Sequence, residues 1–373
     1  MKVLICPDKF KFTFSSVEIA SIIEQIVSSA FCFDTKTVPL SDGGEGFLSV
    51  IASALDIQFS YTKTYDPLGR EIIAKYLFDR EQKTAYLELA QTGALNLLKP
   101  EERNPMNTST YGLGVQIKNV LELGAKKIHI GLGGSSTTDM GMGMAAALGY
   151  VFWDKNGNKL EPVGRNMIHV TRISEPEDNL RSKAGVFACV DVSNVLFGEN
   201  GAAYVYSPQK GASSDEVEIL DMGLRNLSEI IYRQWGMDVS SIPGAGAAGG
   251  LGAGVVAFLN GKIIPGADFI FSLTGLEEQI RDADIIITGE GKFDRQTLSG
   301  KLVWKVVQLA AKYDKPVLIV AGIGSNYDLP SNVDLISLFD TRVDMETAKR
   351  ETEQRLKHKL VKYLAEKYPD ACM

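Results

Sequence analysis

The stretch Lys126–Gly149, K-K-I-H-I-G-L-G-G-S-S-T-T-D-M-G-M-G-M-A-A-A-L-G, has the order of a buried strand, a glycine-rich turn and a helix. Residues 128–130 are the apolar run of a short strand, and the small residues at 141–148 are typical of a helix. Glycine lets a backbone approach a ligand closely, and amides at a helix start favour anions. The stretch therefore predicts an anion site beside Asp139. A tight turn whose Ser and Thr side chains only cap the helix fits the same residues.

The N-terminal segment has the order strand, loop and helix twice over. Residues 3–6 are predicted as a strand and are followed by a helix that a capping pattern starts at Ser15. Residues 37–40 are predicted as a second strand, followed by a helix over 45–54. This repetition predicts a parallel α/β sheet, in which ligands bind at the carboxyl ends of the strands. The polar side chains at those ends are Asp8, Lys9, Lys11 and Asp42.

The pattern changes in the middle of the chain and then returns. Closely spaced extended segments between residues 58 and 89 are typical of antiparallel strands, and a hairpin is expected at 152–159, with Asn156-Gly157 at its turn. Buried apolar runs of the first kind resume at residue 283. We therefore expect an α/β protein with two domains. A discontinuous Rossmann-like parallel domain, residues 1–62 and 283–373, would receive a second, mixed α/β domain, residues 63–282, as an insertion.

Length, charge and cysteine usage exclude several classes of protein. A chain of 373 residues is too long for one ordinary core, in agreement with two domains. A net charge of -7 argues against nucleic acid as the main partner, because phosphate backbones select basic surfaces. No apolar run reaches the roughly 18 residues of a membrane span, and no signal peptide is recognisable. The four cysteines lack metal-ligand spacing, so we expect a cytoplasmic protein with reduced thiols.

Familiar nucleotide and nucleophile signatures do not fit this chain. Gly244, Gly246 and Gly249 match G-x-G-x-x-G, but turn residues precede them where a dinucleotide-binding fold needs a strand. The pair Gly300-Lys301 lacks the remaining residues of a P-loop, and Ser135 lacks the second glycine of a nucleophile elbow. Any nucleotide chemistry must therefore come from another arrangement.

Carboxylates and lysines on glycine-rich loops are the remaining candidates for chemistry. Phosphoryl transfer with Mg²⁺ uses carboxylates to hold the metal, lysines to offset phosphate charge and backbone amides to bind oxygens. Loop Asp and Glu side chains that are only solvated or capping are the simpler interpretation. The candidates are Asp42, Glu45, Asp139, Asp191, Glu290 and Asp294, together with Lys11, Lys210, Lys292 and Lys301.

Ten short motifs, in order along nearly the whole chain, resemble the bacterial glycerate kinases of the type I family, which lack a P-loop. They are P-D-K-F-K at 7–11, D-G-G-E-G at 42–46, P-L-G at 67–69, T-S at 108–109, I-G-L-G-G-S at 130–135, D-V-S-N at 191–194, G-E-N-G-A at 198–202, P-Q-K-G-A at 208–212, P-G-A-G-A-A-G-G at 243–250 and T-G-E-G-K-F-D at 288–294. Some positions depart from the family's usual residues, and these are Lys9, Phe12, Leu113, Ser136, Thr138 and Val195. We still expect the family's activity despite these departures. They concern the detailed shape of the first loop, which carries Lys9 and Phe12.

The resemblance implies ATP-dependent phosphorylation of D-glycerate, with Mg²⁺ as cofactor and 2-phosphoglycerate as product. Family members that form 3-phosphoglycerate leave the position of transfer open. A kinase for another small hydroxy acid and a non-catalytic hydroxy-acid sensor would also fit these residues. The partners implied are D-glycerate and ATP, without nucleic acid or membrane, and an oligomer is left open.

The resemblance also suggests which residues take part in the transfer. Asp191 or Asp42 would accept or orient the proton of the attacking hydroxyl. Lys11 and the Gly133–Gly134–Ser135 backbone would stabilise the transferring oxygens.

Four further residues would hold the substrate and the metal. Arg70 or Lys210 would bind the carboxylate of glycerate, and Glu290 and Asp294 would help to hold Mg²⁺. We expect the site in the cleft between the two domains, where closure would exclude water from the phosphoryl group.

Overall fold

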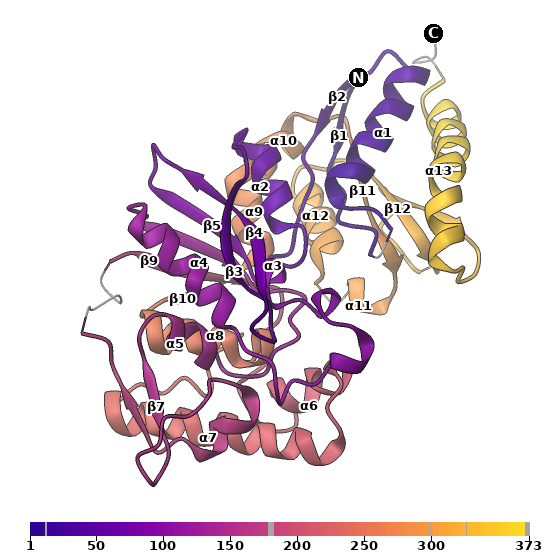
Figure 1. The fold of residues 1–373 in the computed structure, drawn as a ribbon. Helices are drawn as coiled ribbons and strands as arrows, with labels where there is room; N and C mark the ends of the chain where they lie inside the picture. Colours follow the sequence, from indigo (N-terminus) through magenta and orange to yellow (C-terminus); the bar gives the residue numbers. More distant parts are fainter. Residues whose placement is uncertain (12, 178–182, 299, 326, 370–373) are drawn as a thin grey trace. The chain divides into compact units, whose positions relative to one another are not determined.

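The structure is a computed structural model that describes residues 1–11, 13–177, 183–298, 300–325 and 327–369 (Figure 1). The chain forms two compact units. Unit 1 comprises Met1–Asp42, Ser49–Leu55 and the residues from Ala267 onward, and unit 2 comprises Gly43–Leu48 and Asp56–Gly266. The domain boundaries at residues 62 and 283 stay a prediction. Phe12 and Cys372 lie outside the described residues.

Unit 1 is built on a parallel sheet of five strands in the order β13-β12-β11-β1-β2. The strands are β1 (Lys2–Ile5), β2 (Asp34–Thr37), β11 (Ile285–Phe293), β12 (Val317–Gly324) and β13 (Val333–Phe339). Val3 pairs with Ile285 on one side and Thr35 on the other, so N-terminal and C-terminal segments share one sheet. The central strands are runs of buried aliphatic residues, as expected of a parallel sheet covered on both faces.

Helices cover the sheet of unit 1, and Figure 1 shows α1 (Ser16–Ala30, indigo) beside α13 (Met345–Lys367, yellow). The predicted start of α1 is confirmed, since the Ser15 hydroxyl accepts from the Glu18 amide and Glu18 accepts from the Ser15 amide. On α13, a buried stripe at Leu356, Leu360 and Leu364 joins the core. The other helices with residues in unit 1 are α2 (Phe47–Leu55), α9 (Gly266–Thr274), α10 (Leu276–Asp282), α11 (Arg295–Leu298) and α12 (Leu302–Ala311).

Unit 2 contains a mixed sheet of six strands in the order β10-β9-β6-β5-β4-β3. The strands are β3 (Ser60–Tyr65), β4 (Glu71–Asp79), β5 (Thr84–Glu88), β6 (Lys127–Gly131), β9 (Gly185–Val190) and β10 (Lys262–Pro265). Strands β5, β6, β9 and β10 run parallel, whereas β3 and β4 pair antiparallel with their neighbours. The predicted α/β class, with a parallel sheet and an inserted mixed sheet, is confirmed.

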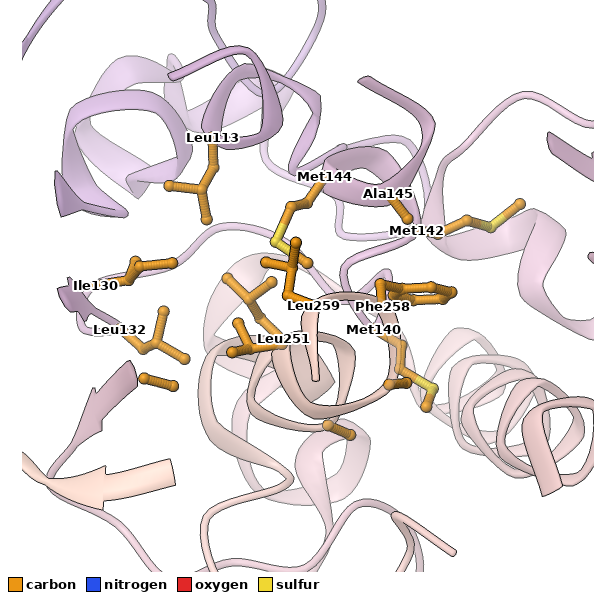
Figure 2. Packing of buried hydrophobic residues seen from close by; sticks show 14 of the residues in the cluster. Leu113, Ile130, Leu132, Met140, Met142, Met144, Ala145, Leu251, Phe258 and Leu259 are labelled. Carbon is orange, nitrogen blue, oxygen red and sulfur yellow. The ribbon is translucent and has the colours of Figure 1, made fainter. Parts of the chain in front are cut away.

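The core of unit 2 lies between this sheet and its helices (Figure 2). Ile130 of β6 packs in one apolar cluster with Leu113, Met144 and Leu251. The helices that supply the cluster are α4 (Tyr111–Glu122), α5 (Met142–Ala147), α6 (Ala202–Tyr206), α7 (Ser214–Trp235) and α8 (Ala247–Leu259), and the short helix α3 (Ala90–Gly93) follows β5. This packing fixes the segment between β6 and α5, which is the glycine-rich stretch singled out by the sequence.

The hairpin expected at residues 152–159 is wrong as a pair of strands. Residues 154–158 do form a tight turn, with Gly157 at φ 80°. However, β7 (Val151–Trp153) takes β8 (Arg172–Ser174) as its antiparallel partner, and Lys159 makes only an isolated bridge to Trp153. The second strand also lies at Asp34–Thr37 instead of 37–40, since the ladder with β1 begins at Lys2. No described helix is long and apolar enough to cross a membrane.

Candidate active site

In unit 1 the loop after β1 lies against the last residues of β11. This strand runs to Phe293 and so includes Gly289 and Glu290, which were predicted to lie on a loop; their pairing with β12 continues the ladder. The amide of Asp8 donates to the carbonyl of Gly289 at 2.8 Å. A Cβ added to Gly291 would lie 3.1 Å from the Lys11 amide nitrogen, so glycine is what permits this approach. The loop that carries Lys11 therefore meets the carboxyl-terminal part of β11, where Glu290 lies.

Two carboxylates and one lysine form a compact group beside these loops. Lys9 Nζ lies 3.2 Å from Asp42 Oδ1 and 3.9 Å from Asp8 Oδ1. Burial raises the pKa of Asp8 to about 7; Lys9 opposes this shift, and the negative charges of Asp42 and Glu290 add to it. Asp42 is thus held by an ion pair, and burial favours the protonated form of the neighbouring Asp8.

Glu290 and Asp294, the predicted metal ligands, both lie in unit 1. Glu290 is 8% exposed, and burial raises its pKa to about 7, against a hydrogen bond from Thr297. Its Oε1 is buried and has no hydrogen-bond partner in the described part of the chain. Asp294 Oδ2 lies 2.9 Å from Lys292 Nζ.

These donors fit Mg²⁺ bound together with a nucleotide. Among the residues that the structure describes, no group of three His, Cys, Asp or Glu could hold a metal alone. Mg²⁺ commonly takes only one or two carboxylates and completes its shell with water and phosphate oxygens. A buried carboxylate oxygen without a partner, as in Glu290, is the kind of donor such an ion needs.

In unit 2 the glycine-rich segments 43–46 and 131–135 lie against each other. A Cβ added to Gly133 would lie 2.2 Å from the Cα of Gly44, and one added to Gly131 would lie 2.7 Å from the carbonyl oxygen of Gly43. Buried Glu88 fixes the same loop by accepting from the amides of Gly46 (3.1 Å) and Leu48 (3.0 Å). Only residues without a side chain allow this approach of two backbones.

Lys210 is bound to the end of the glycine-rich turn. Its Nζ donates to Ser135 Oγ at 2.9 Å and to the Thr137 carbonyl at 2.7 Å, and the residue is only 2% exposed. Burial lowers the pKa of Lys210 to about 7, and the charge of Asp139 opposes that shift. The turn is packed from behind by Gly249, where a Cβ would lie 2.0 Å from the Thr137 carbonyl oxygen.

Asp139 occupies the helix start that was expected to bind an external anion. Its carboxylate accepts from the amide and hydroxyl of Thr110, both at 2.8 Å, and from the amides of Gly141 and Gly143, both at 3.1 Å. The first amides of α5 are therefore satisfied by the chain's own carboxylate, which corrects that part of the expectation. The amides of Gly133–Ser135 donate to no acceptor within the described residues, so they remain available for ligand oxygens.

Asp191 and Arg70 also lie in unit 2, and Asp191 is near the glycine-rich turn, because the Leu132 amide donates to the carbonyl of Cys189, two residues before Asp191, at 3.1 Å. Asp191 follows β9 directly and is exposed. Together with burial, its charge raises the pKa of Tyr206, whose hydroxyl donates to Asn194 Oδ1 at 2.7 Å. The guanidinium of Arg70 donates to Asp66 and Glu102 at 2.5 and 2.8 Å, so acids of the chain already offset its charge.

With the geometry described, comparison with known proteins settles the family. Residues 3–366 match the model of the glycerate kinase family. The chain belongs to the glycerate kinase family. It is 40% identical over 333 residues to a protein of Halalkalibacterium halodurans named glycerate kinase, covering 87% of each chain. It is 39% identical over 326 residues to the glycerate 2-kinase of Escherichia coli, covering 86% of this chain and 85% of that protein.

A solved structure supports the same relationship for the fold. A crystal structure from Salmonella typhimurium LT2, provisionally assigned as glycerate kinase 2, superposes with a TM-score of 0.84 at 32% identity. The match covers 98% of this chain and 97% of the other. The family, the fold class and the kinase class expected from the motifs are thus confirmed.

The glycerate kinase fold distributes the predicted site residues over both units. Unit 1 holds Lys11, Asp42, Glu290 and Asp294, and unit 2 holds Arg70, Gly133, Gly134, Ser135, Asp191 and Lys210. The peptide bond between Asp42 and Gly43 links the two sets covalently. The predicted cleft between domains stays a prediction.

Sequence reasoning named Asp8 and Asp139 as polar residues of the predicted site without a specific role, and it did not name Glu88, which also shapes the site. For Asp139 a signal was present, because Asp side chains commonly accept hydrogen bonds from backbone amides that follow them closely, as Asp139 does from Gly141 and Gly143. Glu88 ends an otherwise apolar strand, and only the structure shows the two amides that it holds.

Proposed function

We propose that this chain is a glycerate kinase that transfers the γ-phosphoryl group of MgATP to the 2-hydroxyl of D-glycerate. The family match over residues 3–366 carries this proposal, since it spans both units and every predicted site residue. The 39% identity to a protein named glycerate 2-kinase supports the 2-position. The glycine-rich turn, held by a buried lysine, supplies the phosphoryl-binding element that replaces a P-loop.

The transferred phosphoryl group must be stabilised where negative charge accumulates. Phosphoryl transfer depends on positioning and on donors aimed at the equatorial oxygens. We assign these donors to the amides of Gly133, Gly134 and Ser135 and to the ammonium of Lys11, an exposed residue. Lys210 positions this element, since its ammonium donates hydrogen bonds to Ser135 Oγ and to the Thr137 carbonyl.

The attacking hydroxyl needs a group that accepts or orients its proton. Asp191 is exposed at the end of β9, which makes it accessible to a substrate. Asp42 is less suited to accept the proton, because the ammonium of Lys9 already offsets its charge at 3.2 Å. We therefore assign proton acceptance to Asp191 and orientation of the hydroxyl to Asp42.

Glu290 and Asp294 are the residues we propose to hold Mg²⁺. When bound, the ion offsets charge on the nucleotide phosphates. The buried, unpartnered Oε1 of Glu290 supports its place in this site. Arg70 and Lys210, the two alternatives expected to bind the glycerate carboxylate, have acceptors within the chain. A contribution of either one to substrate binding would require exchange of those partners.

The role assignments are tested by comparing kcat for Asp191→Asn and Asp42→Asn. Loss of a proton acceptor lowers turnover by about 10²- to 10⁴-fold, and we expect the larger loss for Asp191. Asp238→Asn is the matched control, because this exposed carboxylate only caps the turn at Ser240. Wild-type turnover in both site variants, with an intact fold, would refute both roles.

The function itself is tested with a panel of acceptors. D-glycerate should support ATP consumption, whereas glycerol and tartronate should support little. Preference for another hydroxy acid would identify a different small-molecule kinase. Absence of ATP consumption with every acceptor would indicate a sensor and overturn the proposal.

A further inference from the structure

Arg103 carries a cationic group that no part of the described chain neutralises. Its Nε is buried and has no hydrogen-bond partner, and its guanidinium makes no ion pair with any described residue. The residue as a whole is partly exposed, and the buried Nε is the atom left without a partner. Burying such a donor unpaired is unfavourable, and native proteins retain few of them. Those that are retained call for a ligand or another specific explanation.

Two acids near Arg103 have other partners: Glu102, which precedes it in sequence, and Glu216, which binds the following residue Asn104. Glu102 accepts from Arg70 Nη1 at 2.8 Å and from the Lys99 amide at 3.0 Å. Glu216 accepts from Asn104 Nδ2 at 2.7 Å and from the Ser213 amide at 2.8 Å. The chain thus satisfies the residues on both sides of Arg103 and leaves its guanidinium open.

The segment that begins at Arg103 runs along the glycine-rich turn. The carbonyl of Arg103 would lie 2.1 Å from a Cβ on Gly211, the residue that follows Lys210. Further along, Thr108 Oγ1 donates to the Ser136 carbonyl at 3.0 Å, and Thr110 donates to Asp139. Arg103 therefore belongs to the shell around the proposed phosphoryl-binding element, entirely within unit 2.

The chemistry of the substrate requires a cation in this neighbourhood. In glycerate the carboxylate carbon is bonded directly to the carbon that bears the 2-hydroxyl, so its partner must lie close to the transferring oxygens. A guanidinium is well matched to a carboxylate, which it binds through two parallel hydrogen bonds. Arg70 is already engaged with Asp66 and Glu102, and Lys210 with Ser135.

We propose that Arg103 binds the carboxylate of the hydroxy-acid substrate, an assignment that rests on the proposed glycerate kinase function. The residue then sets specificity for acids over polyols. Its position beside the phosphoryl-binding turn makes nucleotide phosphate the rival anion.

Steady-state kinetics of Arg103→Met in the full-length chain separates these ligands. We expect KM for D-glycerate to rise about 10- to 100-fold, which is the effect of losing a hydrogen bond to a charged group. The KM for ATP should change less than about twofold. The preference for D-glycerate over glycerol, measured as the ratio of kcat/KM values, should fall by the same factor. Arg103→Lys should recover part of the loss, because it keeps the charge without the planar fork.

The matched control is Arg165→Met, since Arg165 is a partly exposed arginine of the same unit that is paired with Glu161. This variant should keep wild-type constants. A rise in KM for ATP alone would assign Arg103 to the nucleotide phosphates, and unchanged values of both constants would assign it no ligand; either result overturns the inference. If Arg103→Met fails to fold, the same readings are taken on Arg103→Lys. An inactive wild type would instead refute the proposed function itself.

Discussion

Lys210 donates a hydrogen bond of 2.9 Å to Ser135 Oγ across 75 residues of sequence, and this contact fixes the end of the glycine-rich turn. The lysine is buried, and the charge of Asp139 stabilises its ammonium form. An interior cation is thereby placed directly behind the amides that we assign to the transferring phosphoryl oxygens.

The burial of Lys210 predicts how stability depends on pH. Its pKa falls from the ordinary 10.5 to about 7 in the folded protein, so the unfolded chain binds more protons between these two values. Stability attributable to this group therefore rises with pH across that window, by up to about 1.4 kcal/mol per pH unit. Lys210→Met should lack this rise and should lose kcat. Urea unfolding of both proteins at pH 7, 8 and 9 measures the difference, and equal pH slopes would show that Lys210 titrates normally.

Asp139→Asn should destabilise unit 2. The carboxylate accepts four hydrogen bonds while fully buried, and an amide would turn an N–H group toward a backbone donor. We expect a loss of about 2–4 kcal/mol in the free energy of unfolding. Asp154→Asn is the control, because that carboxylate holds only a surface turn. Equal losses in the two variants would be inconsistent with a buried cap.

Gly133→Ala tests the approach of the two glycine-rich loops. A Cβ there would lie 2.2 Å from Gly44 Cα, so the loops must separate, at about 1–3 kcal/mol. We expect kcat/KM to fall together with the melting temperature. Gly185→Ala provides the comparison, because its added Cβ meets nothing closer than 3.5 Å. Wild-type activity of Gly133→Ala would mean that the spacing of the loops is unimportant for transfer.

Metal binding is tested through Glu290. Removal of Mg²⁺ by a chelator should abolish activity. Glu290→Gln should raise the Mg²⁺ concentration that gives the half-maximal rate by about tenfold or more, because even the loss of a residue that only hydrogen-bonds to a metal ligand lowers metal affinity by that amount. Glu277→Gln, at an exposed carboxylate that accepts from Tyr313, should leave this concentration unchanged. A variant Glu290→Gln with wild-type Mg²⁺ dependence would remove Glu290 from the metal site.

Much of the fold could be predicted because its signals are local. The capping pair Ser15 and Glu18 marks the start of α1, and aliphatic runs mark the parallel strands. The hairpin at 152–159 was mispredicted because an Asn-Gly turn determines only its own geometry. The partner of β7 is chosen by packing some twenty residues further on, at Arg172–Ser174.

The sequence indicated which residues could belong to the site better than it indicated what each of them does. Lysine is normally a surface residue. Nothing near Lys210 in the sequence indicates that its ammonium is buried and donates a hydrogen bond to the distant Ser135. Arg70 and Arg103 look alike as loop arginines. Only the structure shows that Asp66 and Glu102 neutralise the first and that no described residue neutralises the second.

The most direct test of the central claim is phosphorus NMR of the product formed from D-glycerate and MgATP by the purified chain. We predict a single new phosphomonoester resonance that coincides with authentic 2-phosphoglycerate and grows as ATP is consumed. A product that coincides with 3-phosphoglycerate, or no glycerate-dependent product at all, would contradict the account.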